Sequence, residues 1–111
     1  MPRSYPAYVP ETLSELLDKL GSMILSSPTF LDRTGYFPEK NIDTEFKALD
    51  DGMNANRHRL GQERYHRLTE MSGVVRKLFE ADPNDETGDS LKGREIILDM
   101  MDLIKVRSRT P

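Results

Sequence analysis

The sequence predicts an all-α protein, an elongated antiparallel bundle of three principal helices. Apolar residues recur at helical steps of mostly three, four or seven in long segments, so they fall on one side of each helix. Turn-forming residues and prolines separate these segments. The chain has 111 residues, of which 36% are hydrophobic and 32% charged. That composition favours a single domain with a large surface for its volume.

Residues 1–10 contain three prolines and two tyrosines and are expected to form an extended arm. The first helix begins directly after this arm, because Thr12 to Glu15 matches a capping box. Pro28, preceded by two serines, should end it. Its apolar residues form one continuous face: Leu13, Leu16, Leu17, Leu20, Met23 and Ile24.

The connection that follows is unusually apolar for a loop. It contains Phe30, Leu31, Tyr36 and Phe37 around a bend at Arg33 to Gly35. We expect these four side chains to plug one end of the bundle. An exposed aromatic cluster for binding is the alternative.

The second helical span has no proline between Pro38 and Pro83, and Asn41 or Asp43 can cap it. As one helix it would be about 60 Å long. Gly52 and Gly61 are positions where it could bend or break. Two interpretations follow: one bent helix, or two helices hinged near Gly52, which would give the bundle a fourth helix.

A loop rich in turn residues covers 81–89, and Asp89 or Ser90 should cap the last helix, which runs to about Val106. The expected organisation is an arm (1–10), one helical domain (11–106) and a flexible tail (107–111). The predicted core face of the last helix consists of Gly93, Ile96, Ile97, Met100, Leu103 and Ile104.

The composition excludes several classes of function. There is no cysteine, and therefore no disulfide, thiolate metal site or cysteine nucleophile. The net charge of -3 argues against a dedicated nucleic-acid binder. No apolar run reaches the roughly 18 residues of a membrane span, and no secretory signal is evident, so a cytoplasmic location without membrane partners is expected. No nucleophile elbow or phosphate loop occurs, and we predict no enzymatic activity, catalytic residue or cofactor.

Two segments invite a metal-site interpretation, and both fail. Glu63 and His66 have Glu-x-x-His spacing, but a di-iron bundle needs two such motifs and two more carboxylates. The acidic loop after Asp82 has Thr87 where an EF-hand needs glycine and Gly93 where it needs glutamate. No metal site is predicted.

Arginines interrupt the apolar stripe of the second span. Arg57, Arg64 and Arg67 project into the same sector as its leucines and methionines. An arginine there must pair with acids, extend to water or await a partner. For these three arginines, internal ion pairs are the first expectation, a protein partner is the second, and an anion or nucleic acid is the third.

The last helix has a second, outward strip in which acids alternate with apolar residues: Leu91, Glu95, Leu98, Asp99, Met101 and Asp102. Apolar residues on both sides of a helix indicate that both sides are covered, here either by Arg57, Arg64 and Arg67 of the same chain or by another protein. An apolar strip edged by acids suits a basic partner protein. These six residues are the predicted partner-binding site.

The leading hypothesis is therefore a non-enzymatic protein–protein interaction module. Its most specific form, by analogy of type, is an immunity- or antitoxin-like inhibitor of a basic toxin or enzyme. The alternative is a homodimeric structural or adaptor bundle, in which the basic middle of one chain meets the acidic end of its mate. An arginine-based nucleic-acid or anion binder is the third and weakest hypothesis.

Overall fold

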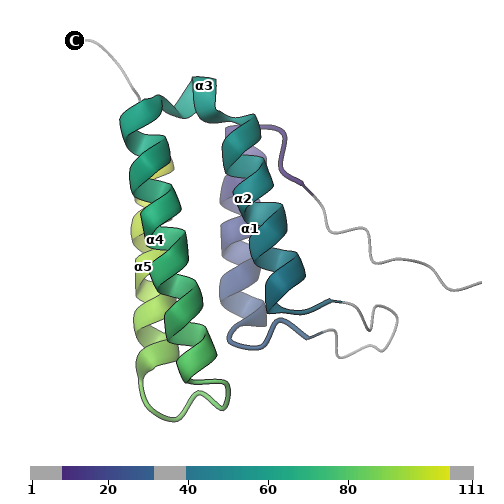
Figure 1. Ribbon diagram of the computed structural model, residues 1–111, viewed down its shortest axis with the longest axis vertical. Coiled ribbons are helices and arrows are strands. Elements are labelled where there is room, and N and C mark those ends of the chain that lie inside the picture. Colours follow the sequence, from purple (N-terminus) through teal and green to yellow (C-terminus); the bar gives the residue numbers. More distant parts are fainter. Residues whose placement is uncertain (1–8, 32–39, 106–111) are drawn as a thin grey trace, which may run out of the picture.

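The computed structural model describes residues 9–31 and 40–105. These residues contain helices and no strand, which confirms the all-α class. Four helices are long, and a single short helix lies between the second and third of them (Figure 1). Their bounds are α1 Leu13–Ser26, α2 Ile42–Ala55, α3 Arg57–Leu60, α4 Gln62–Ala81 and α5 Asp89–Lys105.

The four long helices lie side by side, and the chain reverses direction from each to the next (Figure 1). α1 packs on α2 and α5, and α4 likewise packs on α2 and α5. In the view of Figure 1, α2 and α4 form the near layer and α1 and α5 the far layer, while α3 crosses one end. None of the helices in the described part combines the length and apolarity needed to cross a membrane.

α1 begins where the sequence predicted. Thr12 is its N-cap, and the Thr12 hydroxyl accepts a 3.1 Å hydrogen bond from the Glu15 backbone N–H. The Glu15 carboxylate accepts from the N–H of Glu11 at 2.7 Å, one residue earlier than a capping box requires. The helix ends at Ser26, directly before the predicted stop.

The middle span is divided at Gly61, one of the two glycines where the sequence allowed a break, and not at Gly52. Gly52 lies inside α2 and is buried. A Cβ atom at Gly52 would lie 2.7 Å from Pro10 Cδ and 3.2 Å from Leu16 Cδ2. The glycine is therefore explained by close packing rather than by bending. The start of α2 resolves the capping alternatives in favour of Asn41. Its side-chain oxygen accepts from the Thr44 backbone N–H, and its own backbone N–H donates to the Thr44 hydroxyl, both at 3.0 Å.

The breaks lie instead at Asn56 and Gly61. Asn56 is completely buried, and its amide donates to the carbonyl oxygen of Gly52 at 2.8 Å. A buried amide that bonds the preceding turn competes with the continuing helix. Gly61, between α3 and α4, has a φ of 83°, which favours glycine. The expected three principal helices thus become four long helices and one short one.

The core is formed by all four long helices, by Leu60 of α3 and by Phe30. Phe30 is fully buried and makes edge-to-face contacts with Phe46 and Phe79, with ring centroids 5.7 and 5.5 Å apart. Of the four side chains expected to plug the bundle, Phe30 does so, whereas Leu31 is 57% exposed and contradicts the expectation. Tyr36 and Phe37 lie outside the described residues.

The predicted core face of α5 is confirmed. Gly93, Ile97, Met100 and Ile104 are buried, and Ile96 and Leu103 pack partly buried against the same core. α5 is described to Lys105, so Val106 and the predicted tail lie outside the described residues, as does the arm up to residue 8. The end of the arm is fixed: Pro10 is buried, and the Glu11 carbonyl accepts from Arg59 at 2.9 Å.

Candidate functional site

The outward strip of α5 lies opposite the core face, as the sequence predicted, and is exposed in the described part of the chain. Leu91 and Leu98 are 55% and 53% exposed. Glu95, Asp99 and Asp102 are exposed too, and none of the three has an ion pair or side-chain hydrogen bond within residues 9–31 and 40–105. Three carboxylates and two large apolar side chains therefore share this face without an intramolecular partner in that part of the chain.

Met101 departs from the predicted strip. It is only partly exposed and packs against the core. Its methyl group lies 4.0 Å from the position that a Cβ would take at Gly21 of α1. Met101 therefore lies in the contact between α1 and α5, and five of the six predicted residues remain on the outer face.

The structure adds a residue that the sequence analysis missed, Leu25 on α1, which is 88% exposed. Arg94 lies three residues after Leu91 and four before Leu98, on the same side of α5. Its Nε donates to the Ser27 hydroxyl at 2.9 Å, two residues beyond Leu25. This bond holds the leucines of α5 beside the C-terminal end of α1. We call Leu25, Leu91 and Leu98 the leucine surface.

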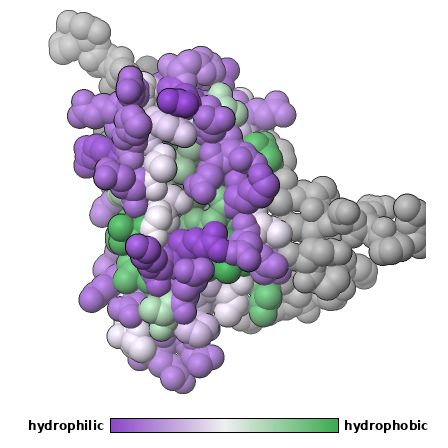
Figure 2. All heavy atoms as spheres, viewed as in Figure 1, coloured by the Kyte–Doolittle hydropathy of each residue, from purple (hydrophilic) through white to green (hydrophobic). Residues whose placement is uncertain are grey.

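The leucine surface belongs to the far layer of the bundle, because α1 and α5 lie behind α2 and α4 in Figure 1. The near face is different in character. Figure 2 shows mostly hydrophilic residues over α2 and α4, with hydrophobic atoms appearing in small separate areas. In the sequence, the only sign of this position is that Leu25 does not belong to the regular apolar face of the first helix.

The three arginines of the apolar stripe have separate environments. The Arg64 guanidinium donates to the carbonyl oxygens of Leu60, Leu103 and Ile104, at 2.7, 3.2 and 3.3 Å. It thereby binds the last turn of α5, where the helix dipole favours a cation. The sequence suggested acidic partners for this arginine. It gave no indication that backbone carbonyl groups would act as acceptors.

Arg57 and Arg67 remain at the surface. The Arg57 guanidinium lies 4.5 Å from the centre of the Tyr65 ring, a cation–π contact. Arg67 is exposed and makes no ion pair or hydrogen bond within the described part of the chain. The three side chains therefore do not form one anion site, and none of these contacts places them over the outer strip of α5.

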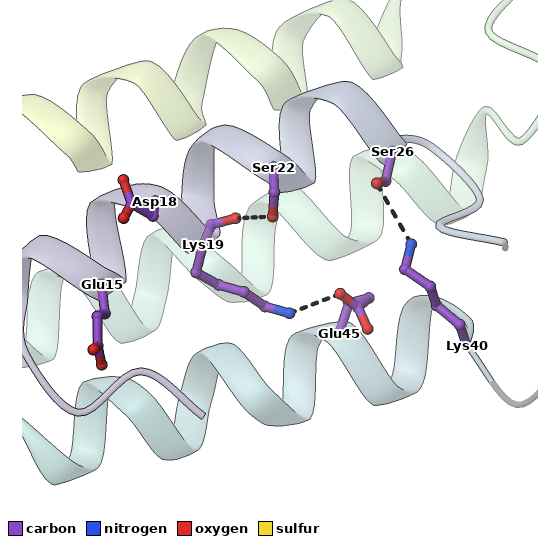
Figure 3. A pocket seen from close by; sticks show the side chains of 7 residues that line it. All are labelled: Glu15, Asp18, Lys19, Ser22, Ser26, Lys40 and Glu45. Atoms are coloured by element: carbon purple, nitrogen blue, oxygen red, sulfur yellow. Dashed lines mark hydrogen bonds and ion pairs between the residues drawn. The ribbon is translucent and has the colours of Figure 1, made fainter. Parts of the chain in front are cut away.

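A hollow of about 520 Å³ lies between α1 and α2. Figure 3 shows its lining residues: Glu15, Asp18, Lys19, Ser22, Ser26, Lys40 and Glu45. At its base Lys19 and Glu45 form an ion pair of 2.7 Å whose side chains are 6% and 5% exposed. Lys40 donates to the Phe30 carbonyl at 3.1 Å and to the Ser26 hydroxyl at 3.5 Å.

Several polar groups that line this hollow are hydrogen-bonded to other lining residues. Ser22 donates to the backbone carbonyl of Lys19 at 2.8 Å, so no general base activates it. The lining contains no histidine. The Lys19–Glu45 ion pair joins α1 to α2 across this hollow.

The acidic loop before α5 is a helix cap. The Asp82 carboxylate is buried and accepts hydrogen bonds from the backbone N–H groups of Glu86, Thr87 and Ser90, at 2.7, 3.1 and 3.0 Å. Burial raises the pKa of Asp82, but these hydrogen bonds outweigh it and hold the pKa well below its ordinary value. In the first turn of α5, Asp82 accepts from the Ser90 N–H and the Thr87 hydroxyl accepts from the Asp89 N–H at 3.2 Å. Asp82 and Thr87, rather than the predicted Asp89 or Ser90, therefore supply the side-chain caps of α5.

The described residues contain no group of three histidine, aspartate or glutamate side chains placed to hold a metal ion. His58 and His66 are both exposed. Comparison of the chain with protein-family models, curated proteins and solved structures gave no match.

Proposed function

We propose that this chain is a non-enzymatic module that binds a basic partner protein through the leucine surface and the adjacent acids of α5. The observation that carries the proposal is the pairing of half-exposed Leu91 and Leu98 with Glu95, Asp99 and Asp102, which have no ion pair or side-chain hydrogen bond in the described part of the chain. An apolar centre beside unpaired carboxylates is complementary to an apolar patch edged by lysine and arginine.

Within this class, the specific proposal is an immunity- or antitoxin-like inhibitor that covers the basic surface of a toxin or enzyme. Charge on such an interface accelerates association and excludes wrong partners, while the buried leucines slow dissociation. The arginine-based nucleic-acid alternative has less support, because Arg59 and Arg64 donate to backbone carbonyls inside the fold. A cytoplasmic location accords with the cysteine-free sequence and belongs to the same proposal.

The test is a pull-down from lysate of the source organism, followed by titration calorimetry with the partner recovered. Replacing Glu95, Asp99 and Asp102 together by serine should weaken binding at least about tenfold and reduce its dependence on salt. A matched triple variant at exposed acids elsewhere (Glu63, Glu70 and Glu86) should bind like the wild type. Equal affinities for the two triple variants would remove the site assignment.

A second pair of variants tests the apolar half of the surface. The double variant Leu91→Ser, Leu98→Ser should bind the same partner with lower affinity. It should stay folded, because both side chains are already half-exposed. Val74→Ser is the control, since Val74 is 49% exposed on α4, away from the leucine surface. If the partner bound the Leu91→Ser, Leu98→Ser double variant as tightly as the wild type, the proposal would be contradicted.

A further inference from the structure

The outer face of α4 has a glycine that the fold does not explain. Gly73 is exposed in the middle of a 20-residue helix, and a Cβ built there would meet nothing within 4 Å. Glycine in a helix interior costs about 1 kcal/mol relative to alanine. Gly93, by contrast, is required because its Cβ would lie 2.6 Å from the Phe79 ring. What Gly73 offers is close access to the α4 backbone from outside.

The charged residues on either side of Gly73 are complementary to the same residues in a second, antiparallel copy of α4. Glu70 lies three residues before it and Lys77 four residues after it, on the same helical face. Both are exposed, and neither has an ion pair or hydrogen bond within the described part of the chain.

In two antiparallel helices whose two-fold axis passes between Gly73 and Val74, residues equally distant before and after the axis face one another. Glu70 of each chain then meets Lys77 of the other, and the two-fold axis forms both pairs at once. Small residues at a helix crossing let the two backbones approach closely. We propose that a second copy of this chain docks on the outer face of α4, with the two α4 helices antiparallel and crossing at Gly73.

This self-association goes beyond the proposed partner binding and uses a different helix. Because the face is mainly polar and exposed ion pairs contribute little, the dimer should be weak and sensitive to salt. The acids and leucines of the proposed partner site belong to α5 and α1 rather than to α4.

Charge exchange gives the sharpest test. By sedimentation equilibrium at low salt, the wild type should show a monomer–dimer equilibrium, and Glu70→Lys or Lys77→Glu alone should weaken it about tenfold or more, since each places like charges opposite one another. The double variant with both reversals should recover the wild-type constant. A mixture of the two single variants should form the heterodimer in preference to either homodimer.

Gly73→Gln separates association from folding. The longer side chain blocks the close approach and should abolish dimerisation, yet it should raise the thermal midpoint because glutamine is the better helix former. Lys92→Glu and Glu95→Lys, on α5, are charge-matched controls that should leave the dimer unchanged. A wild type that remains monomeric at high concentration, or single reversals without effect, would overturn the inference and leave the α5 proposal standing.

Discussion

The ammonium group of Lys19 on α1 and the carboxylate of Glu45 on α2 form a hydrogen-bonded ion pair of 2.7 Å, with 6% and 5% of the two side chains exposed. Burying two charges costs solvation free energy, which their attraction recovers only in good geometry. A hydrophobic pair of similar volume would hold α1 on α2 without that cost. The ion pair therefore specifies the register of the two helices more than it stabilises them.

The consequence is a non-additive pair of mutations. Lys19→Met or Glu45→Leu alone should lower the free energy of unfolding by about 3–5 kcal/mol, because each leaves an uncompensated buried charge. The double variant should lose much less unfolding free energy than either single variant. Urea denaturation measures all three, and Lys47→Met, which removes an exposed pair with Asp51, should change stability by less than about 1 kcal/mol.

The close contact of Gly93 with Phe79 predicts a cost for a single methyl group. In Gly93→Ala the new Cβ would lie 2.6 Å from Phe79 Cε1, so α4 and α5 must separate or the ring must move. We expect a loss of about 1–3 kcal/mol in the free energy of unfolding. Gly73→Ala, at an open position in α4, is the control and should be stabilising. Equal effects of the two alanines would contradict the packing argument.

Arg64 is predicted to be structural, since its guanidinium joins α4 to the last turn of α5 through the carbonyls of Leu103 and Ile104. Arg64→Gln should destabilise the protein by about 1.5–3 kcal/mol, the range for hydrogen bonds of charged groups. Arg67→Gln, at an exposed arginine, should stay within about 0.5 kcal/mol of wild type. Chemical denaturation compares the two, and hydrogen exchange should show the Arg64 effect as earlier opening at the end of α5.

The Asp82 cap predicts a dependence of stability on pH. Backbone hydrogen bonds lower the pKa of Asp82 in the folded protein below the ordinary value of 3.8, so folding favours the ionised form. The stabilisation is therefore complete above the ordinary pKa and is lost progressively as the pH falls from that value toward the lowered pKa of the folded protein. Asp82→Asn should be clearly less stable than wild type near about pH 6, and the difference should shrink toward about pH 3.

Urea midpoints measured across that range test the sign for Asp82. Asp102→Asn is the control, because its exposed carboxylate accepts no hydrogen bond in the described part of the chain. It should stay within about 0.5 kcal/mol of wild type at each pH. A difference between Asp82→Asn and wild type that grows on acidification would show that the carboxylate does not cap α5.

Local signals in the sequence predicted the helices well. Thr12 caps α1 and Asn41 caps α2, since a side-chain oxygen beside free backbone N–H groups acts within one turn. The core face of α5 followed from its period, because burial on one side of a helix repeats every 3.6 residues. The exposed acids of α5 followed from the same period, as the opposite face.

Contacts distant in sequence decided the rest. Gly52 looked like a hinge, but only the return of Pro10 across α2 shows that it is a close-packing glycine. Asn56 breaks the long span because it is buried, and burial is a property of the assembled bundle. Leu25 and Leu91 became parts of one surface only through the bond from Arg94 to Ser27, 67 residues apart.

The sequence by itself thus determined the helical class, the start of the first helix at Thr12, and which face of α5 is apolar. Periodicity and capping are local, and their energies act within a few residues. The tertiary structure decided where the long span breaks, which acceptors Arg64 finds and which leucines stay exposed together. Those outcomes depend on which helices pack side by side, and no local pattern encodes that choice.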